Sequence, residues 1–491
     1  MVNSAQMRAA EKAAFARGIT AEKLMEQAGK RIARSVASFF PAPGKCIVFA
    51  GKGHNAGDAF VAARWLARAG WEIDPRLTTS EKELDKLTRK KLRSLRSASA
   101  AKTKASHLPS GTIILDGLLG LGAKPPLREP IRAACREINR LRAEENAYVF
   151  AIDLPTGLDG DSGETDADSV IADFTLTVGF AKRGLVADSA INIVGRLEVL
   201  PLSGLQSLGE SNYGITASAD SIRYLLPRRK FDAYKNQFGK VGVIAGSKGF
   251  TGAATMCSLG ALRAGAGLVE LFVPEEIYPI VASTTAPEVM VKPVISYKKL
   301  LDQSIDVWAI GPGLGKARAN EILDLIGGAE QPMVVDADGL NILAGKIETL
   351  KKCRGPRLLT PHPGEMKRIF PGGRGSRAKI VGKFCEQYPV TLLLKGSRTI
   401  VGEHDYPLSY NTTGNPGMAT GGMGDVLTGV CVALLAQKLS PYDAGRLGAW
   451  ICGRAAEIAV FNSNASEESL LPCDVIAQLG AAFADLRASG G

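Results

Sequence analysis

Short runs of apolar and β-branched residues, each followed by a glycine-rich turn, recur along the whole chain. Alanine-rich segments with helical spacing separate many of them. In the first half the runs occupy residues 45–51, 112–120, 147–157 and 174–180. In the second half they occupy residues 240–247, 267–274, 307–315, 332–340, 357–365 and 391–397. Because strands covered on both faces read as continuous apolar runs, the pattern predicts repeated βαβ units and parallel sheets.

The alternation fades between residues 201 and 222, where serine and glycine accumulate. A chain of 491 residues is also longer than one hydrophobic core usually supports. We therefore predict two doubly wound α/β domains, covering residues 1–212 and 213–491. Ligands of such open sheets bind at the carboxyl ends of the strands, so we expect one site in each domain.

Composition narrows the class of protein further. The sequence is 45% hydrophobic and 22% charged, without an apolar run long enough to span a membrane and without an apolar leader. Eight cysteines are scattered singly, with no metal-ligand spacing to the four histidines. These features predict a cytoplasmic protein whose cysteines are buried thiols.

The net charge of +11 raises the question of a nucleic-acid partner. Basic residues do not form a stripe interleaved with aromatics, so we expect neither a nucleic acid nor a membrane as partner. The densest basic run, residues 82–96, spaces its leucines along one helix face and is interpreted as a solvated helix. The excess positive charge also suits an anionic small substrate such as a nucleotide.

The segment NPGMATGGMGDVLTG, residues 415–429, places five glycines directly before an apolar helical stretch. Gly421, Gly422 and Gly424 would let backbone N–H groups point into one concavity, to which the helix dipole adds positive potential. Asp425, in the first helical turn, is placed to accept a proton from a hydroxyl that attacks a phosphoryl group. Taken alone, the segment fits a glycine-rich turn before a helix equally well.

Other post-strand loops of the second half carry polar or glycine-rich ends. They are residues 245–267, 311–315, 334–341, 360–366 and 393–401. His362 lies between two prolines that would fix its loop, and we interpret it as a substrate contact. Asp336 and Asp338 are interpreted as residues that orient loops. No Walker A sequence and no zinc signature occurs.

In this order, GFTGA, GPGLG, VVDADGLN, LTPHPGE, LKGSRT and the segment 415–429 resemble the ribokinase-like NAD(P)H-hydrate dehydratase family. The resemblance covers residues 225–485 and implies a ribokinase-like domain. It also implies that a nucleotide phosphorylates the ring hydroxyl of hydrated NAD(P)H, after which phosphate leaves and the double bond returns. Bacterial members use ADP and release AMP, whereas eukaryotic members use ATP; magnesium accompanies the nucleotide.

The resemblance implies a role for each matching residue. Asp425 would be the base that activates the hydroxyl and would contact the hydrate. Asn415 would support the loop or a magnesium-bound phosphate. The hydrate would also be contacted by Ala253, Gly311, Gly313 and His362. The nucleotide would be held by Lys395, Gly396, Ser397, Arg398, Thr399, Gly421, Gly422 and Gly424. Met423 departs from the Ser or Thr that usually stands between these glycines.

Three loops of the first half, residues 50–60, 116–126 and 153–163, follow predicted strands. Asn55, Asp116 and Thr156 offer hard oxygen ligands, which suit a cation that does not need zinc-type ligands. Asp153 ends a buried strand, where desolvation would suit it to proton transfer. Asp159 and Asp161 are interpreted as turn-capping residues. The residues alone leave the function of this domain open.

GHNAGD, DGLLGLG and DLPTGLDGDSG resemble the NAD(P)H-hydrate epimerase family over residues 1–210, which implies a Rossmann-like fold. Asn55, Asp116 and Thr156 would bind potassium, and Asp153 would be the acid/base that interconverts the R and S hydrates. FAKRGL makes Lys182 a further candidate. The hydrate would be bound by His54, Asn55, Ala56, Gly57, Asp58, Gly120, Leu121, Gly122, Ala123, Lys124, Pro125, Pro126 and Asp153.

The leading hypothesis is one bifunctional repair enzyme for NAD(P)H hydrates that uses ADP and forms a homo-oligomer. A small-molecule kinase of ribokinase fold, with a non-catalytic first domain, is the alternative. His54, Ala56 and Ala59 replace the usual Asn, Gly and Gly and could narrow the approach of a phosphate. The substitutions at His54 and Ala56 favour a non-catalytic first domain, whereas the retained Asp116 and Asp153 argue against it. A kinase would accumulate a phosphorylated product without forming a reduced nicotinamide.

Overall fold

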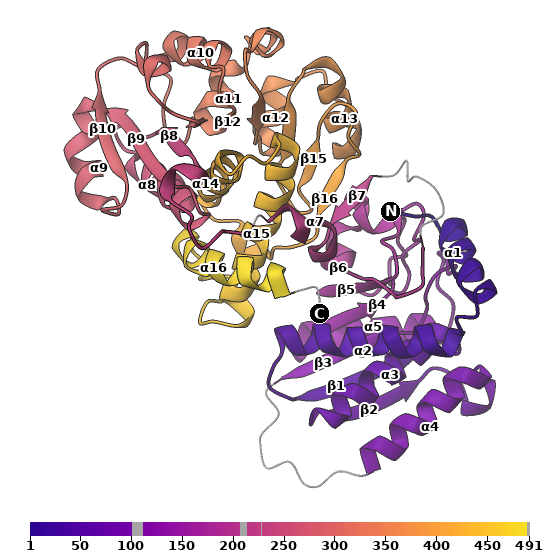
Figure 1. The fold of residues 1–491 in the computed structure, drawn as a ribbon. Helices are drawn as coiled ribbons and strands as arrows, with labels where there is room; N and C mark the ends of the chain where they lie inside the picture. Colours follow the sequence, from indigo (N-terminus) through magenta and orange to yellow (C-terminus); the bar gives the residue numbers. More distant parts are fainter. Residues whose placement is uncertain (101–110, 207–213, 227, 489–491) are drawn as a thin grey trace. The chain divides into compact units, whose positions relative to one another are not determined.

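The computed structural model describes residues 1–100, 111–206, 214–226 and 228–488. The backbone divides into two compact units, Met1–Tyr213 and Gly214–Gly491. The boundary expected between residues 212 and 213 falls in a segment outside the described residues. Each unit is an α/β structure with its own sheet and its own hydrophobic core (Figure 1).

Among the described residues, the first unit contains a parallel six-stranded sheet in the order β2-β1-β3-β4-β5-β6. Its strands are β1 (Lys45–Ala50), β2 (Glu72–Leu77), β3 (Thr112–Gly117), β4 (Tyr148–Ile152), β5 (Phe174–Val178) and β6 (Arg196–Leu200). Its helices are α1 (Ser4–Ala16), α2 (Ala21–Phe39), α3 (His54–Arg68), α4 (Lys86–Ala100), α5 (Ile131–Glu144) and α6 (Ile191–Val194). The strand order reverses at β1, so the loops after β1 and β3 flank the crevice where doubly wound sheets bind ligands.

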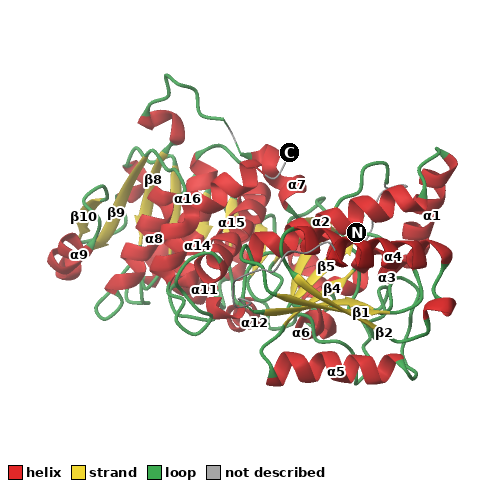
Figure 2. Cartoon of the chain, turned by 90° about the horizontal axis from the view of Figure 1, so that it is seen from below, coloured by secondary structure: helices red, strands yellow, loops and turns green. Residues whose placement is uncertain are grey.

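Both faces of this sheet are covered, which explains its continuous apolar strands. Figure 2 shows α5 on one face and α2 and α3 on the other. Ile138 of α5 packs in one core cluster with Ile114 of β3. On the opposite face, the rings of Phe150 and Phe174 stack at 4.5 Å, and Phe39 of α2 lies 4.7 Å from Phe174.

The second unit contains a ten-stranded sheet in the order β10-β9-β8-β11-β12-β13-β14-β15-β16-β7 within the described residues. Its strands are β7 (Ile215–Ala217), β8 (Lys240–Ile244), β9 (Leu268–Pro274), β10 (Met290–Val294), β11 (Val307–Ile310), β12 (Met333–Val335), β13 (Arg357–Leu359), β14 (Thr391–Leu394), β15 (Ile400–Gly402) and β16 (Ser409–Asn411). The sheet is parallel except where β15 pairs with β14 and with β16.

The helices of the second unit cover this sheet, and their packing fixes the position of the glycine-rich segment. They are α7 (Ala219–Ile222), α8 (Thr251–Arg263), α9 (Tyr278–Thr284), α10 (Ala319–Gly328), α11 (Ala337–Leu343), α12 (Pro363–Ile369), α13 (Arg377–Gln387), α14 (Met423–Ala436), α15 (Pro441–Phe461) and α16 (Pro472–Ala488). Helices α8 and α14 lie side by side over β8 (Figure 1). A Cβ at Gly429 of α14 would lie 2.1 Å from the carbonyl oxygen of Cys257 in α8. Glycine at this position therefore permits the close packing that fixes the start of α14.

The prediction of two doubly wound α/β domains is confirmed. All ten apolar runs form strands, namely β1, β3, β4, β5, β8, β9, β11, β12, β13 and β14. The sequence did not predict β2, β6, β7, β10, β15 and β16. Four of these strands, β2, β6, β10 and β7, end a sheet, and β2 and β10 each contain a proline, which edge strands tolerate.

The basic segment 82–96 differs from the expected solvated helix. A short 3₁₀ turn, Glu81–Glu83, precedes α4, which begins only at Lys86. The Lys91 side chain is 4% exposed, and its Nζ lies 2.6 Å from Glu22 and 2.8 Å from Glu26 of α2. Part of this basic run is thus buried against acidic partners.

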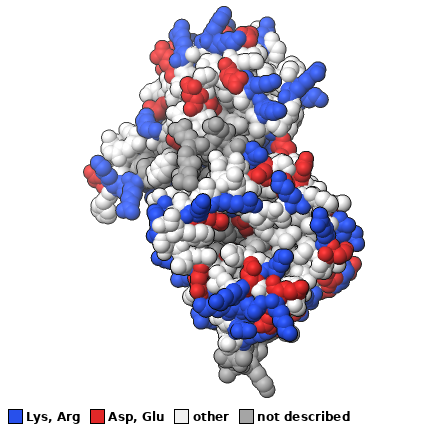
Figure 3. Space-filling view, turned by 90° about the vertical axis from the view of Figure 1, so that its right-hand side faces the viewer, with Lys and Arg blue, Asp and Glu red and all other residues white. Residues whose placement is uncertain are grey.

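Charges and cysteines add two observations about the surface. On the face shown in Figure 3, Lys and Arg are interspersed with Asp and Glu. Six cysteines are buried, but Cys353 is partly exposed and Cys473 is exposed, so the prediction of buried thiols was wrong for these two. No helix among the described residues combines the length and the apolar character that a membrane crossing requires.

Candidate active sites

The glycine-rich segment forms a sharp entry into α14. Gly422 is the residue before the helix and has a φ of 94°, a conformation that favours glycine. In the described part of the chain, the amides of Gly424 and Asp425 in the first helical turn have no hydrogen-bond partner. Unpaired amides and the helix dipole together form a site suited to an anion.

Asp425 lies in this first turn, and the pKa of its carboxyl is raised. Desolvation is the main cause that raises its pKa to about 7, and the neighbouring Asp336 and Glu365 raise it further while Lys395 lowers it. A carboxyl with a pKa near neutrality can accept a proton from a hydroxyl and release it again. The residue that the sequence singled out as a base therefore has the acidity that this role needs.

Asp336 and Lys395 form an ion pair that contacts the first turn of α14, which contains Asp425. Asp336 is 1% exposed; its Oδ1 lies 2.7 Å from Lys395 Nζ, and its Oδ2 accepts a hydrogen bond of 2.8 Å from Thr428. A Cβ at Gly424 would lie 3.2 Å from Lys395 Nζ, so the first turn of α14 packs directly on this pair. Asp338 accepts a hydrogen bond from the amide of Gly315 and holds the 311–315 loop. These contacts fit the interpretation of both aspartates as orienting residues.

The residues expected to contact the hydrate are brought together only in part. A Cβ at Gly313 would lie 3.0 Å from Cβ of Ala253, which places these two residues side by side. Gly311 packs against the main chain of Asp336, where a Cβ would lie 1.9 Å from its carbonyl oxygen. His362 caps α12: its Nδ1 accepts from the amides of residues 364 and 365, while half of its side chain stays exposed.

The loop expected to hold the nucleotide follows β14. The ammonium of Lys395 is paired with Asp336, while its amide donates to the carbonyl of Pro361. Arg377 donates to the carbonyl of Ser397 at 2.7 Å. Gly396 and Arg398 both adopt positive φ, at 140° and 59°. The loop is thus shaped by a main-chain hydrogen bond, by the side chains of Asp336 and Arg377, and by two residues with positive φ.

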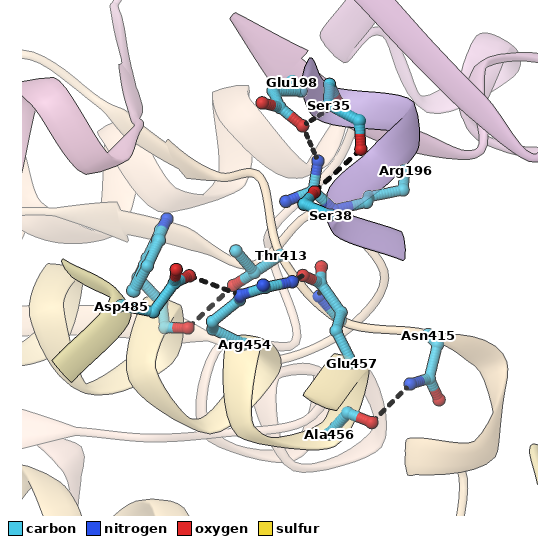
Figure 4. A network of polar contacts seen from close by, with 12 residues as sticks. Ser35, Ser38, Arg196, Glu198, Thr413, Asn415, Arg454, Ala456, Glu457 and Asp485 are labelled. Carbon is cyan, nitrogen blue, oxygen red and sulfur yellow. Dashed lines mark hydrogen bonds and ion pairs between the residues drawn. The ribbon is translucent and has the colours of Figure 1, made fainter. Parts of the chain in front are cut away.

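The segment before the glycines is tied to α15 by a polar network, shown in Figure 4. Asn415 Nδ2 donates to the carbonyl of Ala456 at 3.0 Å, and the amide of Gly414 donates to Glu457 at 2.9 Å. Arg454 bridges Glu457 and Asp485 of α16, at 3.0 and 2.7 Å. These contacts of Asn415 support its loop.

In the first unit, the predicted cation ligands gather at the reversal of the strand order. Thr156 donates its hydroxyl to Asp116 at 2.7 Å, and Asp116 also accepts from the amides of Thr156 and Leu118. Asn55 Nδ2 donates to the carbonyl of Leu119 at 2.9 Å, which leaves its amide oxygen available. Burial raises the pKa of Asp116 to about 6, although these hydrogen bonds oppose the rise.

This donor set suits a hard cation. An amide oxygen, a hydroxyl, a carboxylate and nearby loop carbonyls are hard oxygen ligands, the type that non-zinc cations prefer. Among the described residues, no group of three or more His, Cys, Asp or Glu side chains could hold a metal ion. A cation at this place would rely on neutral oxygens beside the single carboxylate of Asp116.

Asp153 directly follows β4, has a φ of 66° and forms an ion pair with Lys182, whose side chain is fully buried. Lys182 Nζ also donates to the carbonyl of Val178 at 2.9 Å. Desolvation, then Asp153 and Glu11, raise the pKa of Asp58 well above its ordinary value, against the opposing effect of Lys182. Asp58 and Asp153 are therefore close enough to influence one another electrostatically.

The remaining predicted hydrate residues lie at the start of α3 and in one loop, both beside this cluster. His54 is exposed at the start of α3, whereas Ala56 and Ala59 are fully buried. Their methyl groups are therefore part of the core and do not narrow an open approach to the loop. A Cβ at Gly57 would meet Met25 at 2.4 Å. In the loop of residues 120–126, Lys124 Nζ lies 3.6 Å from the carboxylate of Asp159.

The two halves of the chain match two known protein families. The family described as "NAD(P)H-hydrate dehydratase" matches residues 241–479, and the family described as "YjeF-related protein N-terminus" matches residues 21–184. Similar proteins named "Bifunctional NAD(P)H-hydrate repair enzyme Nnr" occur in Moorella thermoacetica (34% identical; 89% of this chain and 88% of the relative) and in Coxiella burnetii (34% identical; 96% and 97%). The chain belongs to this family of bifunctional NAD(P)H-hydrate repair enzymes.

A relative of this repair-enzyme family in Escherichia coli is also 34% identical, over 92% of this chain and 88% of its own. Among solved structures, the ADP/ATP-dependent NAD(P)H-hydrate dehydratase of Bacillus subtilis, co-crystallised with ATP and Mg²⁺, is 27% identical. It covers 56% of this chain and 99% of its own, with a TM-score of 0.49.

Sequence reasoning missed several side chains of both sites. Glu365 stands in the quoted motif TPHPGE, but nothing in the sequence indicated that its carboxylate faces Lys395 and raises the pKa of Asp425. Arg8 and Glu11 of α1 had no sequence signal. Their relevance comes from packing against loops that lie more than a hundred residues further along the chain.

Proposed function

We propose that this chain interconverts the R and S hydrates of NADH and NADPH in its first unit and dehydrates the S form in its second unit. ADP would be the phosphoryl donor, with AMP and phosphate as products. The observation that carries this proposal is Asp425, a carboxyl with a pKa near 7 in the first turn of α14 beside unpaired amides. Membership in the repair-enzyme family supports it.

The dehydration step follows from this geometry. Asp425 takes the proton from the ring hydroxyl of the hydrate, whose oxygen attacks the terminal phosphoryl group of ADP. The amides at the start of α14 stabilise the charge that develops on the transferring group. AMP leaves, the bond between the ring carbon and the ester oxygen then breaks so that phosphate departs with the electron pair, and loss of a proton from the adjacent ring carbon restores the double bond. Lys395 keeps Asp336 paired, so the field around Asp425 stays fixed.

The epimerisation would depend on Asp153. It is held at the end of β4 by Lys182 and faces the same group of carboxylates as Asp58. We propose that Asp153 exchanges a proton with the hydrate and that residues 54–58 and 120–126 bind the rest of the dinucleotide. Asn55, Asp116 and Thr156 would hold potassium, whose charge would draw phosphate oxygens toward these loops.

Magnesium would accompany the nucleotide in the second unit. Mg²⁺ usually keeps several waters and binds through substrate phosphates with one or two protein oxygens, so a dedicated cluster of carboxylates is not required. A location in the cytoplasm and assembly into a homo-oligomer remain predictions from the sequence.

One assay tests both activities. Mixed R and S hydrates are incubated with the full chain and either ADP or ATP, with and without potassium, while the recovery of NADH absorbance is followed. With ADP, we expect NADH to be recovered from both hydrates. If the epimerase is inactive, NADH should be recovered from the S hydrate, and the R hydrate should be consumed only at its spontaneous rate. A phosphorylated product that accumulates without any gain in NADH would instead support the small-molecule kinase.

A further inference from the structure

Helix α1 precedes the region that the N-terminal family matches, residues 21–184, yet it packs beside the predicted epimerase site. The amide of Val2 donates to the carbonyl of Ala181 at 3.0 Å, and the amide of Arg183 donates to the carbonyl of Val2 at 3.0 Å. These bonds flank Lys182, the partner of Asp153. The start of α1 is therefore fixed next to the catalytic candidates of the first unit.

Arg8 projects from this helix onto the loop of residues 120–126. A Cβ at Gly122 would lie 2.4 Å from Arg8 Nη2, so the guanidinium fills the space that a side chain would need. Gly122 also has a φ of 105°, which disfavours other residues. Arg8 is exposed and, within the described part of the chain, makes no hydrogen bond and no ion pair. Its donors are available to a ligand on that loop.

The surroundings of Arg8 are rich in carboxylates. Glu11, one turn further along α1, has a raised pKa because of desolvation and of the charge on Asp153, while Lys182, His54 and Arg8 oppose the rise. The same Glu11 contributes to the raised pKa of Asp58. A substrate that carries phosphate groups would be repelled by these charges unless a cation compensates them.

Two other cations near these loops already have acidic partners. Lys182 is paired with Asp153, and Lys124 lies 3.6 Å from Asp159. Among the described residues, no carboxylate lies within ion-pair distance of Arg8, although Glu11, one turn further along α1, interacts with it electrostatically. The planar guanidinium of Arg8 can donate two parallel hydrogen bonds to a phosphate, a geometry that the ammonium of a lysine does not offer.

We propose that Arg8 binds a phosphate group of the hydrated dinucleotide in the site of the first unit. The inference rests on the proposed epimerase activity and adds a recognition residue to it. Because Arg8 would bind a group remote from the reacting ring carbon, its loss should weaken substrate binding and leave the turnover number unchanged.

The test compares three variants of the full chain, Arg8→Gln, Arg8→Lys and Arg17→Gln. Arg17 follows the end of α1 and bonds to the carbonyl of Gly204, so its variant removes the same charge away from the loop. The R hydrates of NADH and NADPH are supplied separately, without ADP, and the S form is measured by chromatography. We expect Arg8→Gln to raise KM about tenfold with kcat unchanged, Arg8→Lys to raise it less, and Arg17→Gln to match the wild type.

Comparing the hydrates of NADH and NADPH shows which phosphate group Arg8 binds. A larger rise in KM for the hydrate of NADPH assigns Arg8 to the 2′-phosphate, whereas equal rises assign it to the pyrophosphate. A wild-type KM for both hydrates in Arg8→Gln, or a fall in kcat at unchanged KM, overturns the inference. A wild-type protein that fails to accelerate R-to-S conversion refutes the epimerase itself, which is a separate result.

Discussion

Replacing Asp425 by asparagine should make the protein inactive and, at the same time, more stable. Raising the pKa of this carboxyl from 3.8 to about 7 corresponds to roughly 4 kcal/mol of free energy against its ionised form in the folded state. The side chain keeps some contact with water, so we expect about half of this, about 2 kcal/mol. Asparagine has a similar shape and no charge to desolvate.

The sign of this effect depends on pH. As pH rises from about 4 to about 7, the unfolded carboxyl ionises while the folded one stays protonated, so the wild type loses stability over that window and not above it. The variant has no such loss. Its advantage should therefore be smaller at pH 5 than at pH 8.5, where it should raise the melting temperature of the second unit by about 4–8 °C.

Scanning calorimetry at these two pH values measures the stability, and ADP-dependent recovery of NADH from the S hydrate measures the activity. Loss of a general base should slow this recovery by about 10²- to 10⁴-fold, and the wild-type rate should rise with pH through about 7. Asp302→Asn, at an exposed position of the same unit, is the control and should change neither quantity. Wild-type recovery in Asp425→Asn would remove this residue from the mechanism, and lower stability at pH 8.5 would refute the desolvation argument.

Three further predictions concern the other charged groups. Asp153→Asn should reduce consumption of the R hydrate to its spontaneous rate while the S hydrate is still turned over; unchanged R turnover, measured by chromatography, would contradict its role. Lys395→Met should destabilise the second unit by about 3 kcal/mol in calorimetry, because it leaves Asp336 buried without its partner. Adding Asp336→Asn should restore part of that loss, and no restoration would argue against the pair. Asp116→Asn should abolish the stimulation of R-hydrate turnover by potassium over tetramethylammonium, and persistent stimulation would place the cation elsewhere.

The strands that could be predicted from the sequence are those whose residues are buried on both faces. β1 and β14 read as unbroken apolar runs because helices cover both sides of them. β2 has the sequence EIDPRL, with no fully buried residue, and lies at the edge of its sheet. Its sequence resembles a loop because only one neighbouring strand and little of the core contact it.

The candidate sites were predictable where a motif follows a strand. Asp425, Asp116 and Asp153 were chosen because glycine-rich or polar loops at strand ends converge in doubly wound sheets. The partners that set their properties could not be predicted in this way. Lys395 meets Asp336 only because β12, β13 and β14 are consecutive in the sheet, and this order is a property of the whole fold.

The contacts of Gly414 and Asn415 with α15 bear on how the glycine-rich segment can bind a nucleotide at all. Its upstream end is tied to Ala456 and Glu457, and its downstream end continues into α14, which packs tightly against α8. A free peptide with this many glycines would lose much conformational entropy whenever it closed around a phosphate. Here that entropy is lost once, when the second unit folds, so each arriving nucleotide meets a loop whose shape is already set.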